Sequence, residues 1–236
     1  MKPVSPRILS QIYDKLFSEF GPRHWWPGET PFEVAVGAIL TQNTNWTNAS
    51  AAVQQLKRLK LLDSRKLERI PQRRLAQIIR SSGYFNQKAK RLKVFARYLN
   101  RNYGGSMKRL RAVEVSRLRE ELLSLWGIGP ETADSILLYA LEKPVFVVDA
   151  YTKRILERHG LASWNSSYGQ IQNLFYLMPG QGRSRVAKYN EYHALIVETG
   201  KRLCRTKPDC SVCPLRRVGN LKLEPGVKIL SKLHKP

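Results

Sequence analysis

The sequence predicts an all-α protein, and three observations lead to that fold class. Apolar residues recur at spacings of three and four over most of the 236 residues, which is the period of an amphipathic helix. Glycine and proline interrupt this pattern where helices would begin or end. Only Val145–Val148 resembles a strand, and four residues without a partner strand do not form a sheet.

Helix signals place the elements along the chain. Ser5 and Pro6 form a cap and first-turn pair, and the apolar stripe that follows them ends at Gly21. Thr30–Glu33 has the pattern of a capping box and opens a second helix that extends to about Leu40. Further helices are predicted at about 46–60, 71–82, 87–102, 116–125, 131–142, 150–159, 167–177 and 186–203.

The composition indicates a globular protein with a polyanionic partner. Hydrophobic residues make up 42% of the chain, which is enough to build a core. Lys and Arg number 41 against 18 Asp and Glu, a formal net charge of +23, and each cation that neutralises a phosphate strengthens nucleic-acid binding by releasing a counterion. A ribosomal type of protein, a membrane-surface binder and simple solubility are the alternatives. No apolar stretch has the length of a signal peptide or a membrane span, so we expect a cytoplasmic protein without membrane association.

The segment Leu125–Asp134 contains the most specific motif of the chain. Its two glycines, two residues apart, permit backbone conformations that are closed to other residues, and Pro130 suits the first turn of a following helix. The N–H groups of this loop and the positive end of that helix would bind a phosphate without reading sequence. The residues assigned to this surface are Gly127, Ile128, Gly129 and Thr132. An ordinary tight turn is the alternative.

A Val-Asp pair, Val148–Asp149, follows Gly129 at a distance of about twenty residues. A glycine hairpin followed at this distance by such a pair resembles the helix-hairpin-helix glycosylases of the endonuclease III superfamily. Three further segments, Trp25–Pro27, Gly37–Thr44 and Ser82–Leu92, are most similar to the 3-methyladenine DNA glycosylase III branch of that superfamily. The resemblance covers most of the chain and rests on several motifs in order.

The resemblance implies a two-lobed helix-hairpin-helix glycosylase fold with a DNA groove between the lobes. Residues 30–145 would form the helical domain that contains the hairpin. Residues 146–220 would form a C-terminal helical lobe with a cysteine loop, joined by the N-terminal helix within residues 1–29. Residues 221–236 would form a loosely ordered basic tail.

In this superfamily the essential aspartate occupies the position of Asp149. Such a carboxylate stabilises the oxocarbenium-like centre that develops as a glycosidic bond breaks, and it orients or deprotonates the attacking water. An Asp directly before a helical run is also a typical N-cap, whose ionised form the helix N–H groups favour. The two roles are compatible, and Asp149 is the predicted catalytic residue.

Glu131 stands where some members of the superfamily carry a second catalytic group, a lysine. Bifunctional members of the superfamily carry a Schiff-base lysine two residues after the second glycine of the hairpin, and in this chain that residue is Glu131. A carboxylate cannot form the imine that opens the sugar, so a monofunctional glycosylase is predicted. Otherwise Glu131 is a first-turn residue that complements the helix dipole.

The resemblance also assigns residues to the damaged base. An enzyme of this kind extrudes the base from the duplex and holds it against flat side chains. Trp25, Trp26 and Trp46 occupy positions that line the base pocket in the family, and packing in a core is their alternative. Gln42 corresponds to the glutamine that fills the hole left by the extruded nucleotide, with helix C-capping as the alternative. Lys88, with Lys90 and Arg91, is either a phosphate contact in the DNA interface or part of a solvated helix face.

Cys204, Cys210 and Cys213 resemble the C-terminal iron–sulfur loop of endonuclease III relatives. The first gap is one residue shorter than in the family pattern, and Gly219 stands where the fourth cysteine is expected. A [4Fe-4S] cluster normally takes four thiolates, so the cluster is a doubtful cofactor and the chemistry itself needs none. Leu195 stands where cluster-free relatives carry a modified lysine beside the pocket, a departure that leaves the base preference open.

These interpretations predict a monomeric base-excision repair N-glycosylase whose partner is double-stranded DNA with a damaged base. Its predicted reaction is hydrolysis of the glycosidic bond of alkylated purines, especially 3-methyladenine. The alternatives are a glycosylase for oxidised or deaminated bases with weak lyase activity, and a non-catalytic helix-hairpin-helix DNA-binding protein. Asp149, Gln42 and an aromatic pocket favour an enzyme, because gripping the backbone needs none of them. His193 lacks metal-ligand spacing and is assigned a structural role.

Overall fold

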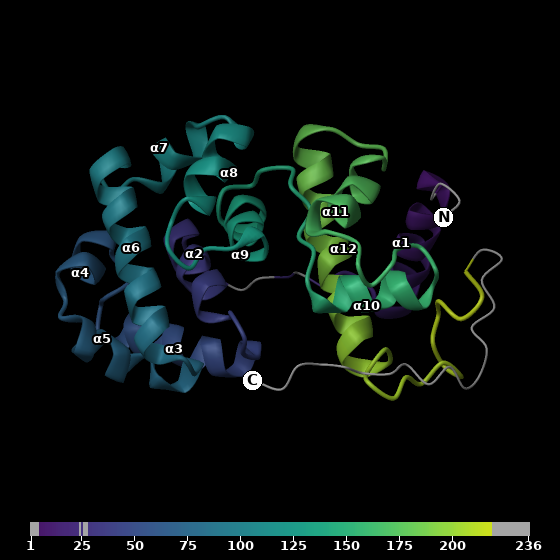
Figure 1. Ribbon diagram of the computed structural model, residues 1–236, viewed down its shortest axis with the longest axis horizontal. Coiled ribbons are helices and arrows are strands. Elements are labelled where there is room, and N and C mark those ends of the chain that lie inside the picture. Colours follow the sequence, from purple (N-terminus) through teal and green to yellow (C-terminus); the bar gives the residue numbers. More distant parts are fainter. Residues whose placement is uncertain (1–4, 24, 26–27, 219–236) are drawn as a thin grey trace. The chain divides into compact units, whose positions relative to one another are not determined.

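The protein is helical in the part that the structure, a computed structural model, describes: residues 5–23, 25 and 28–218. No β-strand occurs in that part, which confirms the all-α prediction (Figure 1). The helices are α1 (Pro6–Phe20), α2 (Pro31–Leu40), α3 (Trp46–Arg58), α4 (Ser64–Arg69), α5 (Gln72–Ile78), η1 (Arg80–Ser82), α6 (Phe85–Tyr103), α7 (Met107–Ala112), α8 (Val115–Leu123), α9 (Pro130–Ser135), η2 (Ile136–Ala140), α10 (Ala150–Arg158), α11 (Tyr168–Tyr176) and α12 (Gly182–Arg202). None of these described helices is both long enough and apolar enough to cross a membrane.

Internal contacts divide the chain into two compact units. The α12 unit comprises the described residues of 1–25 together with those of 146–236. The hairpin unit comprises the described residues of 26–145. The α12 unit therefore joins the first helix of the chain to its last helices.

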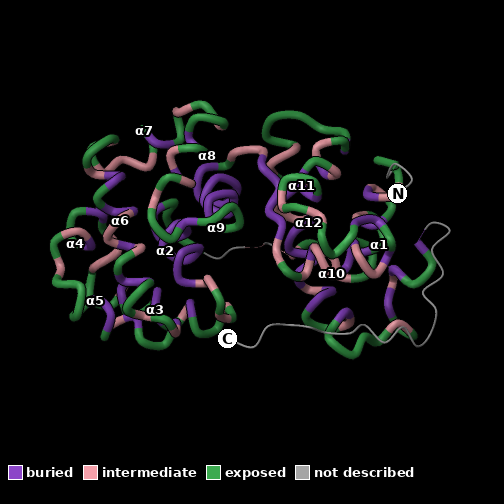
Figure 2. Tube along the Cα trace, viewed as in Figure 1, coloured by how far each residue is buried: buried purple, intermediate pink, exposed green. Residues whose placement is uncertain are grey.

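The hairpin unit is built around α2, which is apolar on all sides. Nine of its ten residues, Phe32 to Leu40, are buried (Figure 2). Thr30 caps the helix, since its Oγ1 accepts a hydrogen bond of 3.1 Å from the N–H of Glu33. Around α2 lie α3, α6, α9 and the π-helical turn η2. A helix that is buried on every side belongs to the core, so the loop that follows α2 leaves from a fixed point.

The α12 unit packs α12 against α1 and α10 around an aromatic core. The rings of Phe146 and Phe175 stack with their centroids 3.5 Å apart, and Tyr192 meets Phe146 edge-on. Phe146 belongs to the segment Val145–Val148, which is fully buried but is not a strand. Buried aromatic pairs of this kind contribute beyond their apolar area. They fix the backbone directly before Asp149.

Most predicted helices are confirmed, with ends that differ by a few residues. The predicted helix 71–82 is divided into α5 and the short 3-10 turn η1, and the predicted helix 131–142 into α9 and η2. The six-residue helices α4 and α7 were not predicted, because fewer than two turns give too little apolar period. The predicted basic tail 221–236 lies outside the described residues.

Candidate functional site

The loop between α8 and α9 is shaped by Gly127. This residue has φ +81°, and a Cβ there would lie 2.6 Å from Nε of Arg91, so only glycine fits. Gly129 differs from the prediction, because it caps α9 at an ordinary φ of −93° and a Cβ there would meet no atom within 4 Å. That open space leaves its backbone accessible to a ligand. Ile128 is buried, and its N–H donates to the carbonyl of Leu125 at 3.0 Å, so it anchors the loop from inside.

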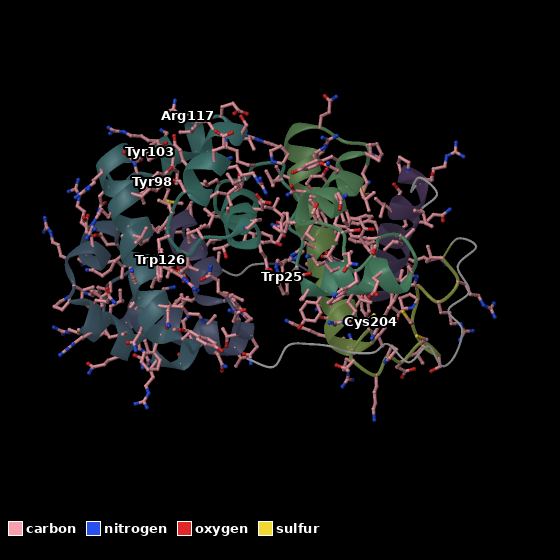
Figure 3. The ribbon with its side chains drawn as sticks, in the orientation of Figure 1. Trp25, Tyr98, Tyr103, Arg117, Trp126 and Cys204 are labelled. Carbon is pink, nitrogen blue, oxygen red and sulfur yellow. The ribbon has the colours of Figure 1, made fainter. Side chains whose placement is uncertain are left out.

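Two polar contacts fix α8, the first helix of this hairpin. Arg119 donates two parallel hydrogen bonds, of 2.7 and 3.1 Å, to the fully buried carboxylate of Asp134 in α9. Such a bidentate pair has defined geometry and joins the two helices of the hairpin. Glu121 accepts hydrogen bonds from the hydroxyls of Tyr98 and Tyr103 in α6 (Figure 3). Burial and the hydrogen bond to Glu121 raise the pKa of Tyr98, which stays a donor.

Gln42 is bound to the hairpin by both ends of its amide. Its Nε2 donates to the carbonyl of Gly127 at 3.0 Å and to Oγ1 of Thr132 at 2.8 Å. Its Oε1 accepts a hydrogen bond of 2.5 Å from Nη1 of Arg91 in α6, a contact that the sequence analysis did not predict. Thr132 is 6% exposed and its hydroxyl serves the hairpin internally, which corrects its assignment to the DNA-facing surface. The C-capping alternative for Gln42 is wrong, because Thr41 occupies that position and its hydroxyl donates to the last turn of α2.

Lys88 is fully buried, so both interpretations of it, a phosphate contact and a solvated face, are wrong. Its Nζ donates to the carbonyl of Leu40 at 2.9 Å and to that of Ser82. Burial, together with the charge of Arg91, lowers the pKa of Lys88 to about 8. The sequence carried a signal for this position, because Lys88 lies one turn before Leu92 on the apolar stripe of α6. Lys88 therefore fixes the end of α2, from which the Gln42 loop departs.

Asp149 lies at the N-terminus of α10 in the α12 unit, and its side chain is 12% exposed. Its Oδ1 accepts hydrogen bonds from the N–H of Thr152 at 2.7 Å and from the Thr152 hydroxyl at 2.9 Å. This geometry is that of a helix N-cap, as one interpretation of the sequence had it. Its other oxygen, Oδ2, lies 3.5 Å from Nε2 of His193 in α12, a neighbour that the sequence analysis missed.

The surroundings of Asp149 keep its carboxyl group ionised. Burial by itself opposes the charged form, but the charge of His193 and the hydrogen bonds from Thr152 outweigh it, so the pKa of Asp149 lies below its ordinary value. A carboxylate that is charged and nearly enclosed can stabilise a developing positive charge strongly, because little water screens it.

The tryptophans assigned to a base pocket lie in different units. Trp25 is half-buried in the α12 unit, where Nζ of Lys201 lies 5.3 Å from the centroid of its ring (Figure 3). Trp46 is the first residue of α3 in the hairpin unit and is half-buried, directly after the capping residue Asn45. Trp26 lies outside the described residues. A common pocket formed by these rings stays a prediction.

The described part of the cysteine loop shows no converged set of metal ligands. Cys204 and Cys213 are buried and Cys210 is partly exposed, but within the described ranges no three His, Cys, Asp or Glu side chains converge as metal ligands. Nη1 of Arg158 donates to Sγ of Cys204 at 3.2 Å, and Nε of Arg154 donates to the Cys204 carbonyl at 2.7 Å. The structure therefore does not show a metal site at the three cysteines, and guanidinium groups of α10 hold this loop.

The chain is similar to known proteins in both sequence and structure. Residues 36–179 match the family model of the HhH-GPD superfamily base excision DNA repair protein. The chain is 43% identical over 218 residues to a candidate DNA repair glycosylase of Methanocaldococcus jannaschii, covering 92% of this chain and 97% of the relative. It is 29% identical over 187 residues to endonuclease III of Thermotoga maritima, covering 79% and 81%.

Two solved structures are similar in fold. The 3-methyladenine DNA glycosylase of H. pylori bound to 1,N6-ethenoadenine has a TM-score of 0.72 and 30% identity, covering 84% of this chain and 97% of that one. An endonuclease III trapped in a covalent intermediate with DNA has a TM-score of 0.76, covering 91% and 95%, and its 22% identity supports the fold alone.

Proposed function

Because this chain belongs to the HhH-GPD superfamily of base excision DNA repair proteins and is a DNA N-glycosylase, we propose that it excises alkylated purines such as 3-methyladenine from duplex DNA. The observation that carries this proposal is the nearly enclosed, ionised Asp149 on a chain similar to a 3-methyladenine glycosylase. The net charge of +23 suits a duplex substrate.

In the proposed reaction the Asp149 carboxylate acts on the sugar. As the bond between C1′ and the base nitrogen breaks, the bonding electron pair leaves with the base and positive charge develops on the sugar. Asp149 stabilises that charge, orients the water that attacks C1′ and accepts the proton that this water loses. A purine alkylated at a ring nitrogen already carries positive charge, so it departs as a neutral base and needs no acid to protonate it. One carboxylate is sufficient for such a substrate.

The substrate is tested on a panel of duplexes that carry one lesion each. We expect release of 3-methyladenine from methylated duplex to exceed release of uracil, thymine glycol and 8-oxoguanine, with strand breakage appearing only after alkali. Base release is measured by chromatography and breakage on denaturing gels. Preferred release of uracil or thymine glycol would overturn the alkylpurine proposal while leaving the glycosylase assignment intact.

Replacing His193 changes the pH dependence of excision. His193→Asn removes the charge that lowers the pKa of Asp149, so burial dominates and the pKa of the carboxyl rises above its ordinary value of about 4. A carboxylate must be ionised to work, so wild-type excision stays insensitive to this group down to about pH 4, whereas the variant loses activity at higher pH. Single-turnover rates between pH 4 and 8 measure the shift. A uniform loss at every pH would mean that His193 contributes packing only.

Arg91 and Gln42 act as one unit in presenting the hairpin. Arg91→Ala and Gln42→Ala each release the contact at Gly127, so each is expected to weaken binding of undamaged duplex by roughly 5–10-fold, the scale of one ordinary hydrogen bond. The double variant should bind no more weakly than the worse single variant, because both remove the same support. Fluorescence anisotropy measures the four affinities. Losses that multiply would contradict the coupling.

Because Glu131 stands in place of a Schiff-base lysine, borohydride trapping should give no covalent complex with DNA. Glu131 occupies the first turn of α9, and a carboxylate there cannot form a Schiff base with the opened sugar. We therefore expect no borohydride-stable adduct with lesion DNA, and Glu131→Lys is the variant designed to create one. Denaturing gels detect the adduct. An adduct with the wild-type protein would show that another amine attacks C1′.

A further inference from the structure

Trp126 is a large ring on the surface of the hairpin unit. It precedes Gly127 in the hairpin loop and is 47% exposed (Figure 3). Nζ of Lys90 in α6 lies 4.1 Å from the centroid of its ring, and Cζ of Arg91 lies 5.8 Å away. A cation at this distance over an indole is attracted by the ring, so the side chains of Trp126 and Lys90 are held together before any ligand binds.

The two cations beside Trp126, Arg91 and Lys90, differ in the other contacts that they make. Arg91 donates a hydrogen bond to Gln42, and its side chain lies against Gly127. Lys90 is exposed, and no salt bridge within the described part of the chain uses it. The open backbone of Gly129 is three residues from Trp126 in the same loop. An exposed flat ring, an ammonium group without a carboxylate partner and an accessible backbone therefore occur together at this loop and the neighbouring α6.

Surfaces of this composition suit a nucleic-acid strand with an unstacked base. Exposed aromatic side chains provide stacking platforms for bases, and a neighbouring cation neutralises the phosphate. Lys90 alone could bind a phosphate. Phosphate binding therefore does not explain why the indole of Trp126 is exposed to water. Bases in an intact duplex offer no free face to a ring, whereas a site that has lost stacking does.

We propose that Trp126 and Lys90 form a DNA-contact surface beside the hairpin, in which the indole stacks on an unstacked nucleotide at the damaged site and the ammonium group pairs with its phosphate. The surface adds recognition of distorted DNA to the backbone grip of the hairpin. It rests on DNA being the substrate and is independent of which base is excised.

The test compares binding to an intact duplex with binding to the same duplex containing a tetrahydrofuran abasic analogue. Trp126→Ala should weaken binding of the abasic duplex by about 10-fold, within the range measured for removing a stacking ring, and affect the intact duplex less than 3-fold. Lys90→Met should weaken both duplexes and reduce the slope of log K against log salt by about 0.9, the value for one phosphate. Trp126→Ala should leave that slope unchanged.

Control variants separate stacking from packing and from fold. Trp126→Phe keeps a ring and should recover most of the affinity, whereas Trp126→Leu keeps bulk without a ring and should not. Trp164, 52% exposed in the α12 unit, and Lys15, exposed on α1, supply matched controls, and their replacement should change neither affinity nor slope. Thermal melting confirms that each variant is folded.

Equal losses on both duplexes for Trp126→Ala, or full recovery by Trp126→Leu, would overturn the proposal. A wild-type protein that binds both duplexes but releases no 3-methyladenine would overturn only the substrate proposal.

Discussion

Asp149→Asn is expected to slow base release by roughly 100-fold or more, the scale for removing a principal electrostatic or general-base group. The asparagine oxygen can still accept the hydrogen bonds from Thr152, so the N-cap of α10 and the fold should be retained. The variant lacks only the negative charge beside the reacting sugar. Affinity for lesion DNA should therefore stay close to that of wild type, and single-turnover kinetics isolate the chemical step.

A second N-cap provides the control for this variant. Asp63 caps α4 in the hairpin unit, and its Oδ1 accepts a hydrogen bond of 2.9 Å from the N–H of Lys66. Asp63→Asn makes the same chemical change at the same kind of position and should leave excision unaltered. Excision by Asp149→Asn at the wild-type rate would show that another residue performs the chemistry.

Arg119→Met should be the most destabilising change within the hairpin. It removes the bidentate hydrogen bonds to the fully buried carboxylate of Asp134, and breaking a buried ion pair from one side costs about 3 kcal/mol. Methionine retains the aliphatic part of the side chain, so the loss reports on charge rather than on volume. We expect the melting temperature to fall by roughly 5–10 °C for a chain of this size.

The matched control lies two residues away in the same helix. Arg117 pairs with Glu121, but its side chain is 74% exposed, so solvent screens the pair. Arg117→Met should therefore change the free energy of unfolding by no more than about 0.5 kcal/mol. Thermal melts of the two variants at one salt concentration make the comparison. Equal destabilisation would mean that burial of Asp134 does not govern the strength of its pairing.

The sequence predicted the all-α class because helical period and helix ends are local signals. It predicted Asp149 because the hairpin and the Val-Asp pair form a recognisable pattern at fixed spacing. It missed the contact between Asp149 and His193 and the contact between Gln42 and Arg91, because the residues of each pair are more than forty positions apart. Such contacts depend on how helices pack, and no local pattern distinguishes these side chains from other polar residues of the chain.

Lys88 was misassigned for a different reason. Its residue type favours an exposed position, and the surrounding Lys and Arg residues reinforce that expectation. Its place on the apolar stripe of α6 pointed to burial instead, and position prevailed over residue type because two carbonyl groups lie within hydrogen-bonding distance of Nζ. Thr132 was misassigned because Gln42, which binds its hydroxyl, belongs to a distant loop.

The N-cap position of Asp149 has a consequence for laboratory evolution. The depressed pKa of this carboxyl means that its ionised form stabilises the folded chain above about pH 4, a contribution that is lost as the pH falls through the folded-state value. Selection for folding and selection for excision therefore both favour Asp here, unlike active-site groups that strain the native state. A randomised library screened only for folded protein should remain enriched in Asp and Asn at position 149, and adding a screen for base release should then remove Asn.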